Sequence, residues 1–194
     1  GTRKAERNAS ALPTQRIEDK DVEEIVSDML QSEDYYLLVG PPGSGKTNVA
    51  LRRMVAGLLR QDGQDNLLLM AYTNRAVDEI CQMLEHLSTE EMPLSYVRLG
   101  QELSCAPTLR HRLLRNVIAP CRNRRETLER LRPIRIFCAT VATLCGQPEL
   151  FRLRHFRTAI LDEASQVLEP QLLPLLTATG PDGRPAIGRM GLIG

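Results

Sequence analysis

The sequence predicts an α/β domain with a mainly parallel sheet and helices on both faces. Short apolar segments alternate with segments of helical period along most of the 194 residues, which is typical of this class. A glycine-rich turn at residues 40–47 joins an apolar segment to a helical one. The acidic pair Asp162 and Glu163 directly follows a later apolar segment, the position at which open parallel sheets place their ligands.

The first third of the chain is expected to contain a linker, a helix, a strand and a second helix. Residues 1–16 are interpreted as a linker ahead of a domain at 17–194. Residues 21–31 place apolar side chains at helical spacing, which indicates an amphipathic helix. Residues 35–39 are apolar, aromatic and β-branched, as in a buried parallel strand, and residues 47–60 return to the helical period.

Strands and helices are expected to alternate through the rest of the domain. The helix at 170–176 has Pro170 in its first turn, where proline costs no hydrogen bond. The last residues are strand-like, which indicates a piece of a longer protein. In chain order the expected elements are a strand at 66–71, a helix at 76–87, strands at 95–99, 134–139 and 158–162, the helix at 170–176, and a strand at 191–193.

An arginine-rich insertion is expected at residues 101–133, as two helices separated by Pro120. Residues 107–135 carry nine arginines and only two acids, whereas residues 18–34 carry eight acids and a single lysine. The arginines either form a solvated face that pairs with the acidic segment, or they add contacts to phosphate groups. They are Arg110, Arg112, Arg115, Arg122, Arg124, Arg125, Arg130, Arg132 and Arg135.

The composition is that of a globular protein, with 42% hydrophobic and 25% charged residues. No apolar segment approaches the ~18 residues of a membrane span, and the polar N-terminus lacks the apolar centre of a signal peptide. The five cysteines are odd in number and widely spaced, which argues against a disulfide framework or a C-x-x-C zinc site. We therefore expect an intracellular, cytoplasmic protein, or a nuclear one in a eukaryote, with no membrane partner.

Residues 40–47 read Gly-Pro-Pro-Gly-Ser-Gly-Lys-Thr and fit the phosphate-binding pattern G-x-x-x-x-G-K-[ST]. Glycines let successive backbone N–H groups point at a polyphosphate, and the following helix adds its positive end. Lys46 supplies a charge for the β- and γ-phosphates, and the Thr47 hydroxyl is placed to bind Mg²⁺. The predicted nucleotide-binding residues are Gly40, Pro41, Pro42, Gly43, Ser44, Gly45, Lys46, Thr47 and Asn48.

The acidic pair supplies the second predicted catalytic element. In an enzyme with a phosphate-binding loop, Asp162 would hold Mg²⁺ together with Thr47, and Glu163 would orient and deprotonate the attacking water. Gln166 would contact the γ-phosphate or that water, so the predicted catalytic residues are Glu163, Lys46 and Gln166. The alternative is an exposed acidic turn before a helix. The presence of the glycine-rich turn in the same chain favours the catalytic interpretation.

Four segments resemble, in order, motifs of superfamily 1 helicases. They are the phosphate-binding turn at 40–47, T-N-R-A-V-D at 73–78, D-E-A-S-Q at 162–166 and L-I-G at 192–194. The sequence is most similar to the 5′-to-3′ group that contains the nonsense-mediated-decay helicase and the helicase–nuclease of DNA replication. The resemblance spans residues 35–194 and implies the first RecA-like domain of a helicase or translocase that uses ATP and Mg²⁺.

By this resemblance, Thr73, Asn74 and Arg75 contact the nucleic-acid backbone, as do Thr140 and Thr143 of a later A-T-V-A-T segment. Both segments follow strands, so their hydroxyls, amides and free helix N–H groups gather at one edge of the sheet, as phosphate contacts require. Helix capping by the same threonines and asparagine is the alternative interpretation.

The implied partners are single-stranded DNA or RNA and the second RecA-like domain of the full-length helicase. Aromatic residues make up only 4% of the chain, so contacts to phosphate and sugar without sequence preference are expected. Because the second domain supplies arginines to the γ-phosphate, this domain alone is expected to hydrolyse ATP weakly. Residues 17–21 lack the glutamine that reads adenine in this family. The alternative function is a phosphate-loop ATPase that acts as a remodelling or signalling switch.

Overall fold

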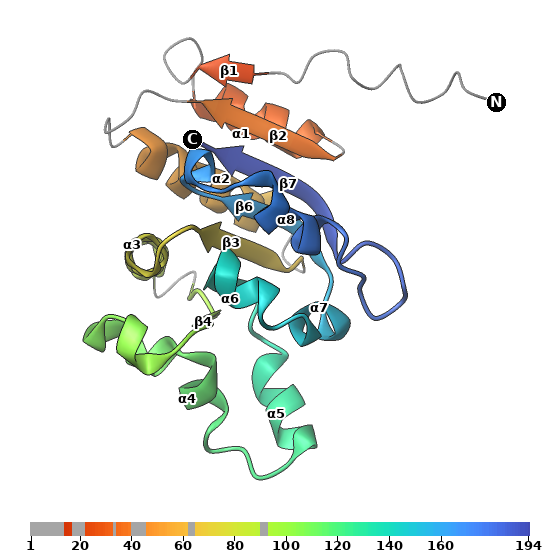
Figure 1. Cartoon of the computed structure of the whole chain (residues 1–194). Coiled ribbons are helices and arrows are strands. Elements are labelled where there is room, and N and C mark those ends of the chain that lie inside the picture. The colour runs from red at the N-terminus through yellow and green to blue at the C-terminus, as the bar shows by residue number, and fades with distance from the viewer. Residues whose placement is uncertain (1–13, 17–21, 33, 40–45, 62–64, 90–92) are drawn as a thin grey trace, which may run out of the picture.

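The structure, a computed structural model, describes residues 14–16, 22–32, 34–39, 46–61, 65–89 and 93–194, and of residues 14–16, 22–23, 30, 46–48 and 61 the backbone alone. Its centre is a seven-stranded sheet in which each strand pairs in parallel with its neighbours (Figure 1). The predicted α/β class with a parallel sheet is confirmed. In spatial order the strands are β1 (Thr14–Arg16), β2 (Tyr35–Val39), β7 (Ile187–Ile193), β6 (Phe156–Leu161), β3 (Leu67–Ala71), β5 (Ile136–Thr140) and β4 (Tyr96–Arg98).

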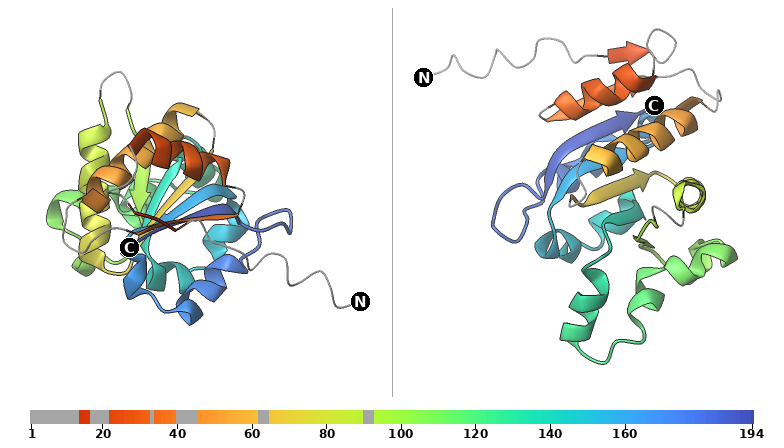
Figure 2. Two further views of the ribbon diagram at one scale, coloured as in Figure 1. Left: turned by 90° about the horizontal axis from the view of Figure 1, so that it is seen from above. Right: turned by 180° about the vertical axis from the view of Figure 1, so that it is seen from behind.

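Helices cover both faces of the sheet (Figure 2). The inner strand β3 is completely buried, and alternate residues enter two separate hydrophobic clusters, since successive side chains of a strand point to opposite faces. Leu67, Leu69 and Ala71 join the cluster that contains α1 (Val22–Gln31), α2 (Lys46–Gln61) and α3 (Asn74–Leu87). Leu68 and Met70 join the cluster that contains α6 (Val141–Cys145), α7 (Glu149–Leu153) and α8 (Glu169–Leu176).

The predicted boundary between linker and domain is corrected. The expected linker at 1–16 ends in a strand, because β1 pairs in parallel with residues 37–39 of β2. β1 is therefore the outermost strand on that side of the sheet. The segment Thr-Gln-Arg is short and polar, so it carries no strand pattern of its own, and its pairing with β2 defines it. Among the helices that the structure describes, none is long and apolar enough to cross a lipid bilayer.

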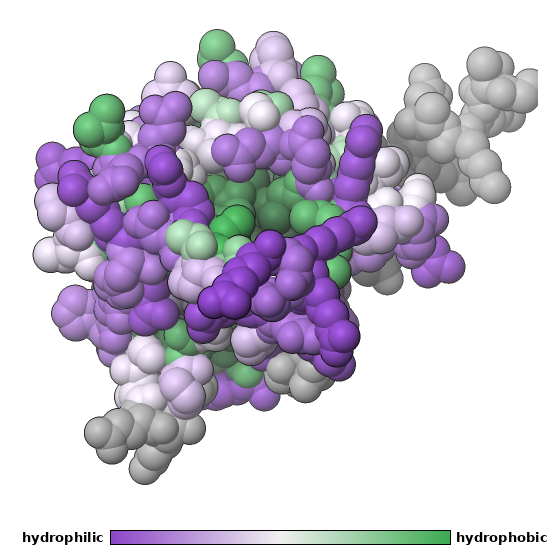
Figure 3. All heavy atoms as spheres, turned by 90° about the horizontal axis from the view of Figure 1, so that it is seen from below, coloured by the Kyte–Doolittle hydropathy of each residue, from purple (hydrophilic) through white to green (hydrophobic). Residues whose placement is uncertain are grey.

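The arginine-rich insertion is less helical than expected. The predicted first helix is replaced by two 3₁₀ turns, η2 (Glu102–Ser104) and η3 (Pro107–Arg112), followed by the short helix α4 (Leu114–Ile118). Leu113, which forms an isolated bridge with Arg98, separates η3 from α4. Pro120 lies between α4 and α5 (Arg124–Leu131), as predicted. Figure 3 looks onto the end of the molecule that α4 and α5 form, where hydrophilic side chains surround a recessed hydrophobic centre.

The strands of the sheet end together at one edge, which positions the candidate site. Leu38 of β2 pairs with Ile193 of β7, and Leu192 of β7 pairs with Leu161 of β6. Across the sheet Leu161 pairs with Met70 of β3, and Ala71 pairs with Thr140 of β5. The C-terminal ends of β2, β7, β6, β3 and β5 therefore lie side by side.

Candidate nucleotide and nucleic-acid site

The predicted phosphate-binding turn has the strand and the helix that it requires on its two sides. β2 ends at Val39, and α2 begins at Lys46 and continues for 16 residues. The first N–H groups of a helix have no partner within the helix and favour a bound anion. Residues Gly40, Pro41, Pro42, Gly43, Ser44 and Gly45 lie outside the described residues, as do the side chains of Lys46, Thr47 and Asn48.

Asp162 lies directly beyond β6 and continues the sheet toward β3, because its N–H donates to Met70 O over 2.8 Å. Burial is the largest influence on its carboxyl group, and it raises the pKa to about 6, with the nearby carboxylates of Glu163 and Glu79 adding to the effect. The Glu163 N–H donates to Asp162 Oδ1 over 3.0 Å and opposes the shift. A cation beside Asp162 would relieve this unfavourable burial of negative charge.

Asp162 is the described residue at this edge that could contribute to a magnesium site. No group of three His, Cys, Asp or Glu side chains within the described ranges is arranged to hold a metal by itself. Mg²⁺ in phosphoryl-transfer enzymes uses one or two carboxylates, with water and phosphate oxygens filling the other positions. Among the described residues, the partly buried carboxylate of Asp162 is a ligand of the kind that this smaller requirement calls for.

Glu163 has a backbone conformation that is rare for its residue type. Its φ of 55° and ψ of 37° are left-handed, and it is the only non-glycine residue with positive φ in the described part of the chain. Such a conformation costs on the order of 1 kcal/mol and is concentrated at functional sites. The turn leads into a single 3₁₀ turn, η4 (Ala164–Gln166), in which the Gln166 N–H donates to Glu163 O over 3.0 Å and the Gln166 side chain is exposed.

Two of the three threonines predicted to contact nucleic acid, Thr73 and Thr140, cap helices. Thr73 Oγ1 accepts from the Ala76 N–H over 3.1 Å at the start of α3. Thr140 Oγ1 accepts from the Thr143 N–H over 3.1 Å at the start of α6, and lies 2.8 Å from Thr143 Oγ1. Because Ala71 pairs with Thr140 in the sheet, both helix starts lie at the same edge. Capping and backbone recognition are compatible, since the free N–H groups of both helices remain at that edge.

Asn74 and Arg75 differ in their contacts. Arg75 is highly exposed, with 91% of its side-chain surface accessible, and pairs with Glu79 one turn later, at 3.1 Å. The Asn74 side chain is bonded to Arg98, because its Oδ1 accepts from Arg98 Nη2 over 3.2 Å. The sequence interpretation missed Arg98, which is completely buried at the end of β4. The available signal was an arginine in the otherwise apolar run Tyr96–Leu99.

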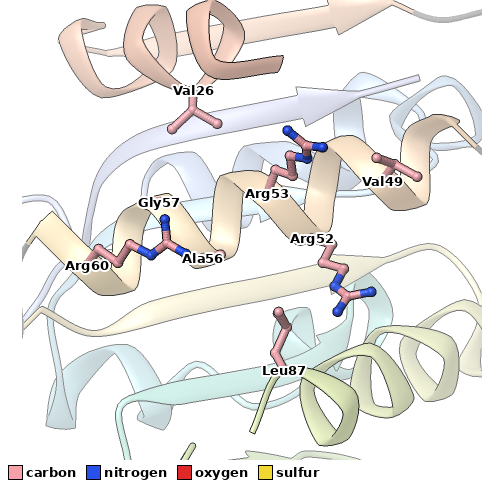
Figure 4. A pocket seen from close by; sticks show the side chains of 8 residues that line it. All are labelled: Val26, Val49, Arg52, Arg53, Ala56, Gly57, Arg60 and Leu87. Atoms are coloured by element: carbon pink, nitrogen blue, oxygen red, sulfur yellow. The ribbon is translucent and has the colours of Figure 1, made fainter. Parts of the chain in front are cut away.

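A groove among the described residues lies along α2. It has a volume of about 700 Å³ and runs along the outer side of α2, between Val26 of α1 and Leu87 of α3 (Figure 4). Arg52, Arg53 and Arg60 line it, and no ion pair of these arginines occurs within the described ranges. None of the predicted site residues whose side chains the structure describes lines this groove.

Comparison with known proteins defines the class and then the family. The fold is that of a RecA-like helicase domain, with a TM-score of 0.55 and 18% identity to Mss116p in a structure bound to ssRNA and AMP-PNP, over 87% of this chain and 33% of that one. Residues 17–119 match the family described as AAA domain (AAA_11), and the chain belongs to this family.

Two relatives are DNA replication ATP-dependent helicase/nuclease DNA2 of Mus musculus and of Saccharomyces cerevisiae. The mouse protein is 32% identical over 151 residues, 75% of this chain, and the yeast protein is 32% identical over 154 residues, 77% of this chain. The predicted resemblance to the replication helicase–nuclease is confirmed. The chain spans 13% of the mouse protein and 9% of the yeast protein.

Proposed function

We propose that this chain is the ATP-binding and ATP-hydrolysing domain of a nucleic-acid helicase or translocase. The observation that carries the proposal is the shared sheet edge, where the start of α2, the acidic pair Asp162 and Glu163, and the starts of α3 and α6 meet. A single edge that holds both an anion-binding helix start and two polar helix starts can bind a nucleotide and a nucleic-acid backbone together.

In this proposal residues 40–48 hold the phosphates of ATP, with the Lys46 ammonium between the β- and γ-phosphates. Thr47 and Asp162 hold Mg²⁺, which would neutralise phosphate charge when bound. Glu163 accepts a proton from the attacking water. At the same time the water oxygen bonds to the γ-phosphorus, and the bond between the γ-phosphorus and the bridging oxygen of ADP breaks. Gln166, exposed one turn beyond Glu163, contacts the γ-phosphate or the water.

The proposed second ligand is single-stranded DNA or RNA, bound by Thr73, Asn74, Arg75, Thr140 and Thr143 without sequence preference. Support comes from the exposed Arg75 and from the free N–H groups at the starts of α3 and α6. We further propose that a second RecA-like domain completes the ATP site, that this domain alone hydrolyses ATP weakly, and that the protein works inside the cell.

The test is ATP hydrolysis by the helicase that carries this domain, measured with and without single-stranded oligonucleotide. Stimulation of kcat by oligo-dT or oligo-U supports the proposal, because it shows that nucleic-acid binding is coupled to ATP turnover. Hydrolysis that is independent of nucleic acid would instead favour a remodelling or signalling ATPase.

A further inference from the structure

Arg98 is a buried charge with an unusually complete set of partners. Its Nε donates to Asp78 Oδ1 over 2.7 Å, and its Nη1 donates to Leu99 O over 3.2 Å. Its Nη2 donates to Ser104 O over 2.8 Å and to Asn74 Oδ1 over 3.2 Å. A buried guanidinium is tolerated only where its charge and most of its N–H groups are satisfied, and these contacts meet that condition.

The chain makes room for this guanidinium at Gly100. Gly100 has φ of 135°, a conformation that side-chain-bearing residues rarely adopt. A Cβ atom at this position would lie 2.7 Å from Arg98 Nη1. The guanidinium of Arg98 therefore occupies space that a side chain at residue 100, only two positions later, would need.

The contact with Arg98 determines which way the Asn74 amide points. A guanidinium can only donate hydrogen bonds, so the Asn74 oxygen must face Arg98 and the NH₂ group must face away from it. Asn74 is exposed, and no acceptor for its Nδ2 occurs among the described residues. The result is an oriented donor at the start of α3, next to the helix N–H groups that favour an anion.

Asp78 extends the same cluster to the arginine-rich insertion. Its Oδ1 accepts from Arg98, and its Oδ2 accepts from the Ala106 N–H over 2.9 Å. Ser104 O, another acceptor of Arg98, belongs to η2 at the root of the insertion. One buried guanidinium thus connects α3, β4 and the start of the insertion.

We propose that Arg98 is a positioning residue for nucleic-acid binding, which fixes the Asn74 amide as a donor to a phosphate or sugar oxygen. The inference rests on the proposed function, since it requires that α3 faces a nucleic-acid backbone. It adds a residue that cannot itself touch the ligand, because Arg98 has no accessible surface.

The experiment is a double-mutant cycle on binding of fluorescein-labelled oligo-dT and oligo-U, measured by anisotropy. Asn74→Ala removes the donor and is expected to weaken binding roughly tenfold. Arg98→Lys keeps the buried charge but cannot reach Asp78, Ser104 and Asn74 together, so binding is expected to weaken roughly fivefold. In the Asn74→Ala background, Arg98→Lys is expected to have no further effect, because it acts through Asn74.

Two further variants separate positioning from stability. Asn74→Asp still accepts from Arg98 but has no NH₂ group, so its unfolding midpoint should equal or exceed that of the wild type while binding weakens roughly tenfold or more. Arg112→Lys is the matched control, since Arg112 also joins the insertion to α3, through Glu85 at 2.9 Å, but does not contact Asn74. It is expected to leave binding unchanged.

Three outcomes overturn the inference. Equal weakening by Arg98→Lys in both backgrounds would show that it acts through general destabilisation. Wild-type affinity in Asn74→Asp would show that the amide donates nothing to the ligand. Failure of the unmodified chain to bind either oligonucleotide would overturn the proposed nucleic-acid function together with this inference, whereas the first two results leave that function standing.

Discussion

The carboxyl group of Asp162 is partly buried at the end of β6, within the electrostatic reach of Glu163 and Glu79. In the absence of a cation this position favours the protonated acid, which is why its pKa rises to about 6. A residue that is unfavourable as a free carboxylate is suited to hold a cation, since metal binding removes the penalty. The charged carboxylate of Asp162 therefore lowers the stability of the metal-free protein but favours the binding of a metal.

Replacing Asp162 with asparagine is expected to stabilise the nucleotide-free protein near neutral pH. The folded pKa of about 6 exceeds the unfolded value, so the wild type loses stability as pH rises toward 6 and remains at that lower level above it. Asparagine resembles the protonated acid and still accepts from the Glu163 N–H. The gain in unfolding midpoint should be largest at about pH 7.5 and should shrink below about pH 6. A pH-independent difference would contradict this origin of the shift.

Glu163 combines a left-handed backbone conformation with the proposed role of general base. Glu163→Gln keeps the shape and the left-handed turn but removes the proton acceptor, so nucleotide should still bind. We expect kcat of the nucleic-acid-stimulated enzyme to fall by roughly 10²–10⁴, the usual contribution of a general base. The measurements are nucleotide affinity by calorimetry and steady-state hydrolysis. An unchanged kcat would leave Glu163 as a turn residue with no chemical role.

At the scale of the elements, the arginines of the insertion form two groups, those with an acidic partner and those without one among the described residues. Some are paired, Arg112 with Glu85 of α3, and Arg110 and Arg125 with Glu102 and Glu129 of the insertion itself. Arg98 of β4, just before the insertion, pairs with Asp78 of α3. None of these acids belongs to the segment 18–34, which the sequence suggested as a partner. Exposed arginines without a described acidic partner remain at 115, 122, 124, 130 and 132.

These exposed arginines allow a test of phosphate contact. For single strands, the slope of log K against log salt is about −0.7 per phosphate neutralised. Replacing Arg122, Arg124 and Arg130 with alanine should therefore flatten this slope by roughly two units if all three make contact. The matched control replaces Arg52, Arg53 and Arg60, which line the groove on α2, and should leave the slope unchanged. Equal slopes in both triple variants would make the insertion a solvated face.

Periodicity predicted the long elements well, because their burial follows from their own residues. The strands around 35–39, 66–71 and 134–139 are continuous apolar runs, and all were found near the expected places. β1 was missed because a three-residue polar edge strand exists only through its pairing with β2. The burial of Arg98 depends on Asp78, 20 positions earlier, and such a long-range partner leaves little trace in local sequence.

At the scale of the whole molecule, α3 links the two halves of the proposed site. Its first turn holds the nucleic-acid candidates Asn74 and Arg75, while Glu79, the partner of Arg75, contributes to the raised pKa of Asp162. The Asp162 N–H is also bonded to β3, the strand that leads into α3. Nucleotide and nucleic-acid ligands would therefore meet on adjacent, hydrogen-bonded segments rather than on distant surfaces.

The sheet edge is proposed above all to bind Mg-ATP, and calorimetric titration of this chain with ATP in the presence of Mg²⁺ tests that most directly. The wild type is expected to bind, and Lys46→Ala is expected to bind at least roughly tenfold more weakly, because no other group replaces the charge between the β- and γ-phosphates. Equal unfolding midpoints for the two proteins would confirm an intact fold. Equal affinity of the two proteins for Mg-ATP, or no binding by the wild type, would contradict the assignment of this edge as a nucleotide site.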